Sequence, residues 1–593
     1  MSDPPPSQPR YKWRPALRKP WATRVEEFRH SLAYIDALPQ LTLLGLASGI
    51  AAAVIIVFFR LLVDGSLSLF LANSPDNFES LSATWRFALP AFGAAAIGVA
   101  LHFLKSHTRN VSVSHVLDRL HNYQGVLPLR NCLVQFFAGA VALISGQSVG
   151  REGPAVHLGA GAASLLGQWL KLPNNSLRTL VGCGVAAAIA ASFNTPMAGV
   201  IFAMEVILME YTITGFIPVI LASVSGAVIT QLVFSDHKLF AISAVEMASL
   251  LELPFMVFGG LVVALAAAAF TKAHLLCFRL QHWPIIVRLL LAGLVTGSVA
   301  VYVPQILGMG YDTINSAILG QVSLEVLLIV VILKMFITGF SVGLGMPGGL
   351  IGPMLVIGAC VGGILGHTGN TLYPEHASNA GFYVVLGMAA MMGAVINAPL
   401  AALIAILELT YNPNIIFPSM VMIVVACFTT QQVFRCQGIF VEQLKLAGRP
   451  IHAEPAQQLL SRVGVRSVMS TAFVISASQI SINAAHQMLE KKPQWIIFDD
   501  GEQNKLVLKA VDLANYLESL AEQEPQDDSA IKLKHIPGQR YQAFPIRQQA
   551  NLFEAGDLMK HNNSDVVLVE KPTPSPTIVG VITRDMINNY YGT

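Results

Sequence analysis

Charged residues are scarce in this chain of 593 residues: Asp, Glu, Lys and Arg together make up 12% of it, and hydrophobic residues make up 54%. A soluble globular protein carries about 25% charged residues. The formal net charge is +2, so nothing in the charge balance indicates a nucleic-acid partner. The scarcity of charge excludes an ordinary soluble protein and indicates a polytopic membrane protein.

Cysteines are few, and they lack any spacing typical of zinc ligands or of a disulfide framework. The polar start MSDPPPSQPR also lacks the apolar stretch of a cleaved signal peptide. We interpret the cysteines as small hydrophobic residues of the membrane domain and expect no metal site. They are Cys132, Cys183, Cys277, Cys360, Cys427 and Cys436.

Long apolar runs recur through most of the chain, for example LTLLGLASGIAAAVIIVFF (41–59) and PFMVFGGLVVALAAAAF (254–270). A helix of about 20 residues crosses the hydrocarbon core of a bilayer. Residues 36–446 are therefore predicted to form an all-α membrane domain. The arm formed by residues 1–35 is basic, and we expect it on the cytoplasmic side because Lys and Arg next to membrane helices favour that side.

The composition changes after about Leu446, where the chain becomes charged and alternates short β-type runs with helical stretches. Within this tail, AFVI (472–475) and AFPI (543–546) are related by one offset, 543 − 472 = 71. Two modules of similar size are therefore expected. The predicted parts are a linker at 447–461 and modules at 462–522 and 533–593.

The membrane part also contains an internal repeat. GVAAAIAASFNTPMAGVIFAMEV (184–206) aligns with GMAAMMGAVINAPLAALIAILEL (387–409). Upstream of the copies lie two glycine-rich breaks that end in proline, GREGP (150–154) and GLIGP (349–353). Paired broken segments in the two halves of a transport protein indicate a binding site at the repeat interface.

The first break places Arg151 and Glu152 side by side in an apolar segment, where each charge costs about 2.5–3.5 kcal/mol on the insertion scale. The glycines allow a helix to begin here with free backbone N–H groups, and a helix N-terminus attracts an anion. If GLIGP presents a second N-terminus to the same point, an anion site forms between them. Glu152 would occupy that site when ionised and leave it when protonated, which describes a gate.

GREGPAVHLGA, the paired GLIGP, the repeated block and the two-module tail resemble the CLC family of chloride channels and chloride/proton antiporters, over about residues 41–446. The tail, with VRSVMS near its start and GVITRD near its end, resembles a tandem pair of CBS domains. The resemblance implies an all-α membrane domain with an inverted-topology repeat, followed by a cytoplasmic α/β tail. It also implies a homodimer with one pore per subunit and Glu152 as the external gating glutamate.

The resemblance also implies which residues bind the anion. Val111 and Phe440 stand where the family has the anion-coordinating serine, or its substitute, and tyrosine, so both familiar hydroxyl donors are missing. Backbone N–H groups then remain as donors. The expected set is the helix start Gly150, Arg151 and Gly153 and the opposite segment Gly349, Leu350 and Ile351.

Val206 stands at the position of the family's internal proton-transfer glutamate. Glu205 points about 100° away from it on a helix, whereas Glu210 shares its face. Glu210 is a candidate substitute, although an ordinary carboxylate facing the cytoplasm is the simpler interpretation. We therefore predict a voltage- or pH-gated anion channel or an uncoupled transporter. The alternative is a chloride/proton antiporter with a non-standard proton path.

Two other function classes were considered. GQSVG (146–150) matches the G-x-S-x-G motif of serine hydrolases, but it lies between apolar helical runs, and His157 has no evident acid partner. A cation channel would need acidic rings or a carbonyl filter. Neither class fits, so we expect no enzymatic activity.

In the tail, Thr583 and Asp585 resemble the hydroxyl and carboxylate with which CBS domains hold the phosphate and ribose of an adenine nucleotide. The first module keeps Asp512 but has Ala510 in place of the threonine, so we expect either one nucleotide cleft or a scaffold without ligand. Transport requires no cofactor. The expected partners are chloride or a similar anion, membrane lipid and a second copy of the chain. The expected place is a bacterial inner membrane, with the N-terminus and the tail cytoplasmic.

Overall fold

The computed structural model describes residues 38–71, 76–234, 240, 246–372, 374, 377–449, 451, 459–499, 505–521, 530–571 and 577–591. Its residues fall into two compact units, which are treated separately. The first unit is Leu38–Gly464 with Gln549–Ser564, and the second contains Val465–Gln548 and Asp565–Thr593. The basic arm at residues 1–35 and most of the linker at 447–461 lie outside the described residues.

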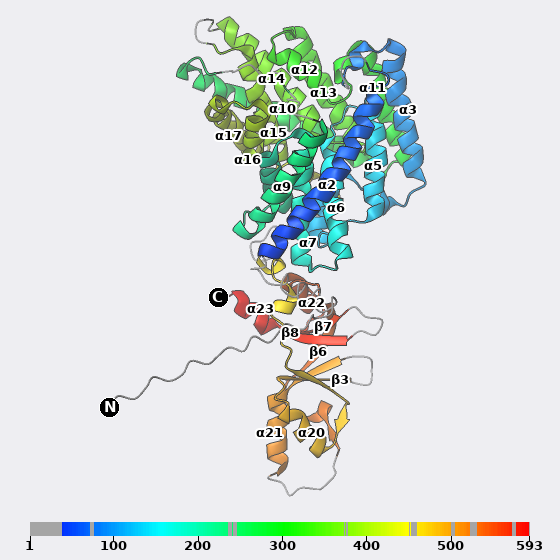
Figure 1. The fold of residues 1–593 in the computed structure, drawn as a ribbon, viewed down its shortest axis with the longest axis vertical. Helices are drawn as coiled ribbons and strands as arrows, with labels where there is room; N and C mark the ends of the chain where they lie inside the picture. The colour runs from blue at the N-terminus through cyan, green and yellow to red at the C-terminus, as the bar shows by residue number, and fades with distance from the viewer. Residues whose placement is uncertain are drawn as a thin grey trace, which may run out of the picture. The chain divides into compact units, whose positions relative to one another are not determined.

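The first unit is helical, and α2 lies lengthwise against α6, α7 and α9 (Figure 1). Among the described residues, nine helices are long and apolar enough to cross a membrane. The multi-pass membrane domain predicted from the apolar runs is therefore confirmed. The helices are α2 Leu38–Leu67, α3 Ala83–His102, α4 Ser112–Asn122, α5 Leu129–Ile144, α6 Glu152–Trp169, α7 Asn174–Phe193, α8 Pro196–Phe202 with the π-helical turn Ala203–Leu208, α9 Ile213–Phe234, α10 Leu253–Phe278, α11 Ile285–Tyr302, α12 Tyr311–Ile318, α13 Leu324–Gly343, α14 Ile351–Leu372, α15 Ala380–Ile396, α16 Pro399–Thr410, α17 Ile416–Gln432 and α18 Ile439–Leu446.

The sequence repeat specifies the same helix packing twice. A Cβ on Gly184 of α7 would overlap the carbonyl oxygen of Gly159 on α6, and a Cβ on Gly387 of α15 would overlap that of Gly358 on α14. Small residues let membrane helices approach closely, because lipid supplies no hydrophobic force between them. Each copy therefore packs against the helix that follows its glycine-rich break.

The two copies also share their helix ends. Asn194 and Asn397 close α7 and α15 in the left-handed conformation, with φ of 58° and 59°. Asn tolerates this conformation better than most residues with a side chain. Pro196 and Pro399 then begin α8 and α16, at the first helical position where the missing N–H has no partner to lose.

Two matched glutamates tie the copies together. Glu205, in the turn after α8, accepts hydrogen bonds from the backbone N–H of Leu400 (3.3 Å) and Ala401 (2.7 Å) at the start of α16. Glu408 of α16 accepts from Met197 (2.9 Å) and Ala198 (2.7 Å) at the start of α8. Each carboxylate thus caps the helix start of the other copy, where negative charge is stabilising.

The second unit contains a six-stranded sheet in the order β1-β3-β4-β6-β7-β8. In each half, one parallel pair is followed by one antiparallel pair: β1 with β3 and β3 with β4, then β6 with β7 and β7 with β8. This recurrence follows the two-module pattern of the sequence. The elements are β1 Phe473–Ser476, β2 Gln479–Ile480, α20 Ile482–Glu490, β3 Trp495–Asp499, β4 Lys505–Lys509, α21 Ala510–Ala521, β5 Ile531–Lys532, β6 Arg540–Arg547, β7 Val566–Lys571, β8 Thr577–Thr583 and α23 Arg584–Tyr591; α22 Leu552–His561 belongs to the first unit.

Candidate anion site

The two glycine-rich breaks lie against each other. Gly150 N donates to Gly349 O at 2.8 Å, and Gly349 N donates to Gly150 O at 2.7 Å. Helix α6 begins two residues after Gly150, and α14 begins two residues after Gly349. The structure therefore brings together two helix N-termini, and the positive ends of both helix dipoles share one region.

The Glu152 carboxylate occupies this region. Its side chain is fully buried, and Oε1 accepts a hydrogen bond from the Tyr311 hydroxyl at 3.0 Å. A Cβ built on Gly352, in the first turn of α14, would lie 3.1 Å from Oε1, and one built on Gly150 would overlap Oε2. The carboxylate is thus enclosed by the backbone of both breaks, in the place where a free anion would meet both helix starts.

Arg151 is buried next to Glu152, and no ion pair joins it to the Glu152 carboxylate among the described residues. Its guanidinium carbon lies 5.6 Å from the centre of the Tyr311 ring and 5.7 Å from that of Phe193. A cation over an aromatic face is attracted by the ring quadrupole. Arg151 therefore contributes positive charge near the site without neutralising Glu152 directly.

Sequence reasoning missed Tyr311 and the groups that hold it. Asp76 accepts hydrogen bonds from the backbone N–H of Met309 (3.0 Å) and Tyr311 (2.7 Å), which fixes the start of α12. Lys334 of α13 is fully buried and donates to the carbonyl of Gly308 at 3.1 Å. Tyr311 lies 159 positions from Glu152 in the sequence, and no local motif connects the two.

Val111, Leu350 and Phe440 line one cavity of about 580 Å³. The structure thus places these three residues, which the sequence proposed as anion-binding, around a common space. Arg109, Arg288 and Arg449 line the same cavity, so it is rich in positive charge. A concave site with several cations raises the local concentration of anions.

The start of α4 offers this cavity few free donors. Ser112 has a φ of 74°, its backbone N–H is bound by Gln135 Oε1 at 2.7 Å, and its hydroxyl donates to the carbonyl of Gly348 at 3.3 Å. Val111 and Phe440 carry no hydroxyl. Val111 and Phe440 therefore provide neither of the two hydroxyls expected from the family, whereas Ser106 and Ser114 line other parts of the same cavity.

Val206 and Glu205 line a second cavity of about 640 Å³, which Phe440 also borders. Glu205 is held by the start of α16, as described above. Glu210 forms an ion pair with Arg462, with Nη2–Oε2 and Nε–Oε2 distances of 2.8 and 3.1 Å. Both carboxylates near Val206 therefore have bonding partners in the structure, backbone N–H groups for Glu205 and a guanidinium for Glu210.

The predicted nucleotide residues lie in the second unit. Thr583 ends β8 and is almost buried, and its hydroxyl accepts from Met586 N at 3.4 Å. Asp585 is exposed in the first turn of α23. In the described part of the chain, no three His, Cys, Asp or Glu side chains gather where they could hold a metal ion.

Comparison with known proteins agrees with this geometry. The putative chloride channel protein ClcB-like of Ralstonia nicotianae is 29% identical over 58% of this chain and 81% of its own length. The H(+)/Cl(-) exchange transporter ClcA of Vibrio cholerae is 29% identical over 48% of this chain and 63% of its own length. A solved structure of a slow cyanobacterial Cl-/H+ antiporter aligns with 69% of this chain and 98% of its own, with a TM-score of 0.61 and 19% identity. The family model of voltage gated chloride channels matches residues 92–431, and the chain therefore belongs to the voltage-gated chloride channel (CLC) family.

Proposed function

We propose that Glu152 gates the anion path of this protein by competing with the transported anion. Members of the family are channels or transporters and not enzymes, and the anion transported is chloride or a similar ion. The observation that carries the proposal is the buried Glu152 carboxylate between the starts of α6 and α14. A negative side chain in a place that favours anions can be displaced by an anion or removed by a proton.

The gate works through charge. When ionised, the carboxylate satisfies the helix N-termini and blocks the site. When protonated, it loses most of its attraction to the helix dipoles, and an anion can take its place. From the cavity lined by Arg109, Arg288 and Arg449, anions reach the site at raised local concentration.

In the cavity lined by Val111 and Phe440, selectivity among anions rests on backbone donors and distant arginines, because these two residues provide no hydroxyl. A side-chain hydroxyl at a fixed place recognises size and hydration more sharply than a diffuse positive field does. We therefore expect weak discrimination among chloride, bromide and nitrate.

Two transport modes remain as candidates. Val206 cannot hold a proton, which favours a channel or an uncoupled transporter. Proton-coupled exchange is the second candidate, because two of the similar proteins are named as chloride/proton exchangers. Both modes use the same anion site and the same gate.

The tail is proposed to be a cytoplasmic, regulatory pair of CBS domains, supported by the two halves of its sheet. Thr583 and Asp585 would hold an adenine nucleotide. The proposed assembly is a homodimer with one pore per subunit in a bacterial inner membrane.

The test uses full-length protein in liposomes. A chloride gradient is imposed, and chloride efflux is recorded from pH 4 to pH 8. The wild-type protein should conduct better at acidic pH, and Glu152→Gln should abolish this pH dependence. Glu325, exposed in the first turn of α13, provides the matched control Glu325→Gln, which should behave as wild type. Unchanged pH dependence in Glu152→Gln would contradict the gate.

A further inference from the structure

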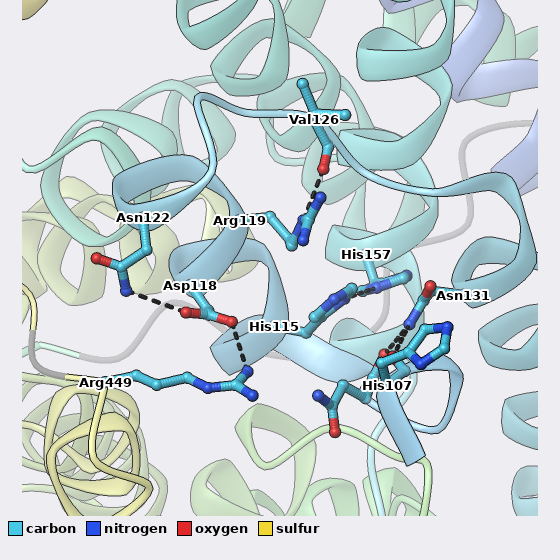
Figure 2. A network of polar contacts seen from close by, with 10 residues as sticks. His107, His115, Asp118, Arg119, Asn122, Val126, Asn131, His157 and Arg449 are labelled. Carbon is cyan, nitrogen blue, oxygen red and sulfur yellow. Dashed lines mark hydrogen bonds and ion pairs between the residues drawn. The ribbon is translucent and has the colours of Figure 1, made fainter. Parts of the chain in front are cut away.

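Two buried histidines from different helices, α4 and α6, contact each other. His115 of α4 and His157 of α6 are joined by an Nδ1–Nε2 hydrogen bond of 2.8 Å. Their rings are stacked, with centroids 5.1 Å apart and an angle of 22° between the planes. Figure 2 shows the two rings side by side, each on its own helix.

The two ends of this pair have different surroundings. His115 lines the cavity that also contains Val111 and Phe440. His157 is fully buried, and its Nδ1 has no hydrogen-bond partner among the described residues. His157 Nδ1 thus lies in the protein interior, on the helix that begins with Glu152. His115 borders the cavity.

The charged neighbours of the pair act on His115, and one of them, Arg449, lines the cavity. Arg119 and Arg449 act electrostatically on His115, whereas His157 has only His115 as a neighbour of this kind. Arg449 is itself paired with Asp118 of α4, at 2.8 Å (Figure 2). Burial, together with these positive charges at His115, favours neutral imidazoles, so an imidazolium forms only briefly during each transfer.

The other helices packed against α6 also carry titratable groups, and two of these are bound to backbone carbonyls. Arg60 of α2 donates to the carbonyl of Ala191, and Arg178 of α7 donates to that of Leu120. The titratable residues of α2, α5, α7 and α14 are Arg60, Asp64, Arg130, Cys132, Arg178, Cys183, Cys360 and His367.

We propose that His115 and His157 carry protons between this cavity and Glu152, in place of the carboxylate that Val206 cannot supply. The inference rests on the proposed anion transport gated by Glu152 and selects its second mode, proton-coupled exchange, because it assigns a proton path that does not need Val206. An imidazole suits this role because it can accept a proton at one nitrogen and release another from the second nitrogen.

Each transfer conserves protons. A proton from the cavity binds His115 Nε2, and the proton on His115 Nδ1 moves along the hydrogen bond to His157 Nε2. The proton on His157 Nδ1 then leaves towards the Glu152 carboxylate, five residues earlier on the same helix, through water that enters with the anion. One proton enters and one leaves, and both rings are left as the Nε2–H tautomer. The starting tautomers return when the two rings separate and water adds a proton at Nδ1 of each ring and takes one from its Nε2.

The experiment records chloride efflux and proton uptake together in liposomes that contain the full-length protein and a chloride gradient. The variants are His115→Gln and His157→Gln, which retain a polar side chain but cannot relay a proton. His121→Gln is the matched control, since His121 lies on the same helix and binds the carbonyl of Ile207 instead. Elution as a single folded species and retained chloride flux show that each variant is folded.

We expect wild-type protein to take up protons as chloride leaves. Each pair variant should lose this uptake by at least about tenfold, with chloride flux and the His121→Gln control within about threefold of wild type. Proton uptake retained in both pair variants would overturn the relay, and so would a wild type that moves chloride but no protons. Chloride flux without a Glu152-dependent response to pH would instead overturn the gate, so the two failures are distinguishable.

Discussion

The two glycine-rich breaks, residues 150–154 and 349–353, have the same backbone arrangement but different side chains. Each forms one half of a reciprocal hydrogen-bonded pair, and each leads directly into a helix. The first carries Arg151 and Glu152, whereas the second carries Leu350 and Ile351. The backbone of both breaks therefore encloses the Glu152 carboxylate, and only the first break carries a side chain that we propose as a gate.

The largest effect is expected from Gly349→Ala. A Cβ at this position would lie 2.5 Å from the backbone N of Gly153 and 2.9 Å from Gly150 O, so it would push the two breaks apart. Overpacking of this kind costs about 1–3 kcal/mol, occasionally more. We expect a lower thermal midpoint in detergent and a chloride flux near background. Adding Glu152→Ala should not restore the flux.

The matched substitution Gly150→Ala should act differently. The three atoms nearest its Cβ all belong to the flexible Glu152 carboxylate, whereas the Cβ of Gly349→Ala would meet backbone atoms as well as that carboxylate. The carboxylate should be displaced, which would raise chloride flux at neutral pH. Combined with Glu152→Ala, the substitution should have no further effect. If Glu152→Ala changed the chloride flux of the Gly150 and Gly349 variants equally, the proposal would be contradicted. The proposal assigns the shape of the site to the backbone and its closure to Glu152.

A medium effect is expected at the matched pair Glu205 and Glu408. Each carboxylate binds two backbone N–H groups of the opposite copy, so Glu205→Ala and Glu408→Ala should each lower the free energy of unfolding by about 1–3 kcal/mol. Thermal unfolding in detergent measures this loss, and Glu325→Ala is the exposed control. A loss confined to one glutamate would show that the copies do not share this contact equally.

The membrane domain, the repeat and the meeting of the two breaks could be predicted because local patterns carry them. Apolar length predicts spans, and a constant offset predicts matching helices. The match of Asn194 with Asn397 and of Glu205 with Glu408 predicts that these residues occupy equivalent positions in the two copies. Glu205 binds the start of α16, as its repeat partner Glu408 binds the start of α8.

Contacts between distant, unrepeated residues could not be predicted. Tertiary packing brings Tyr311 to Glu152 and His115 to His157. The sequence around Tyr311 and around His115 contains no motif that indicates these contacts. The His pair requires α4 and α6 to lie at a particular angle, which periodicity does not determine. These unrepeated contacts are also the ones that make the first break differ from the second.

The smallest effect is expected from Tyr311→Phe, which removes the hydroxyl bound to Glu152 and keeps the ring under Arg151. The hydroxyl stabilises the ionised carboxylate by about 1–2 kcal/mol, so its loss should move the activation of chloride flux to a pH higher by about one unit. Tyr383→Phe is the control, because the Tyr383 hydroxyl donates to Glu252 instead. If Tyr311→Phe leaves the pH of activation unchanged, the backbone of the two breaks alone holds the ionised carboxylate. The asymmetry of the site would then come from Glu152 alone, with no contribution from the residues around it.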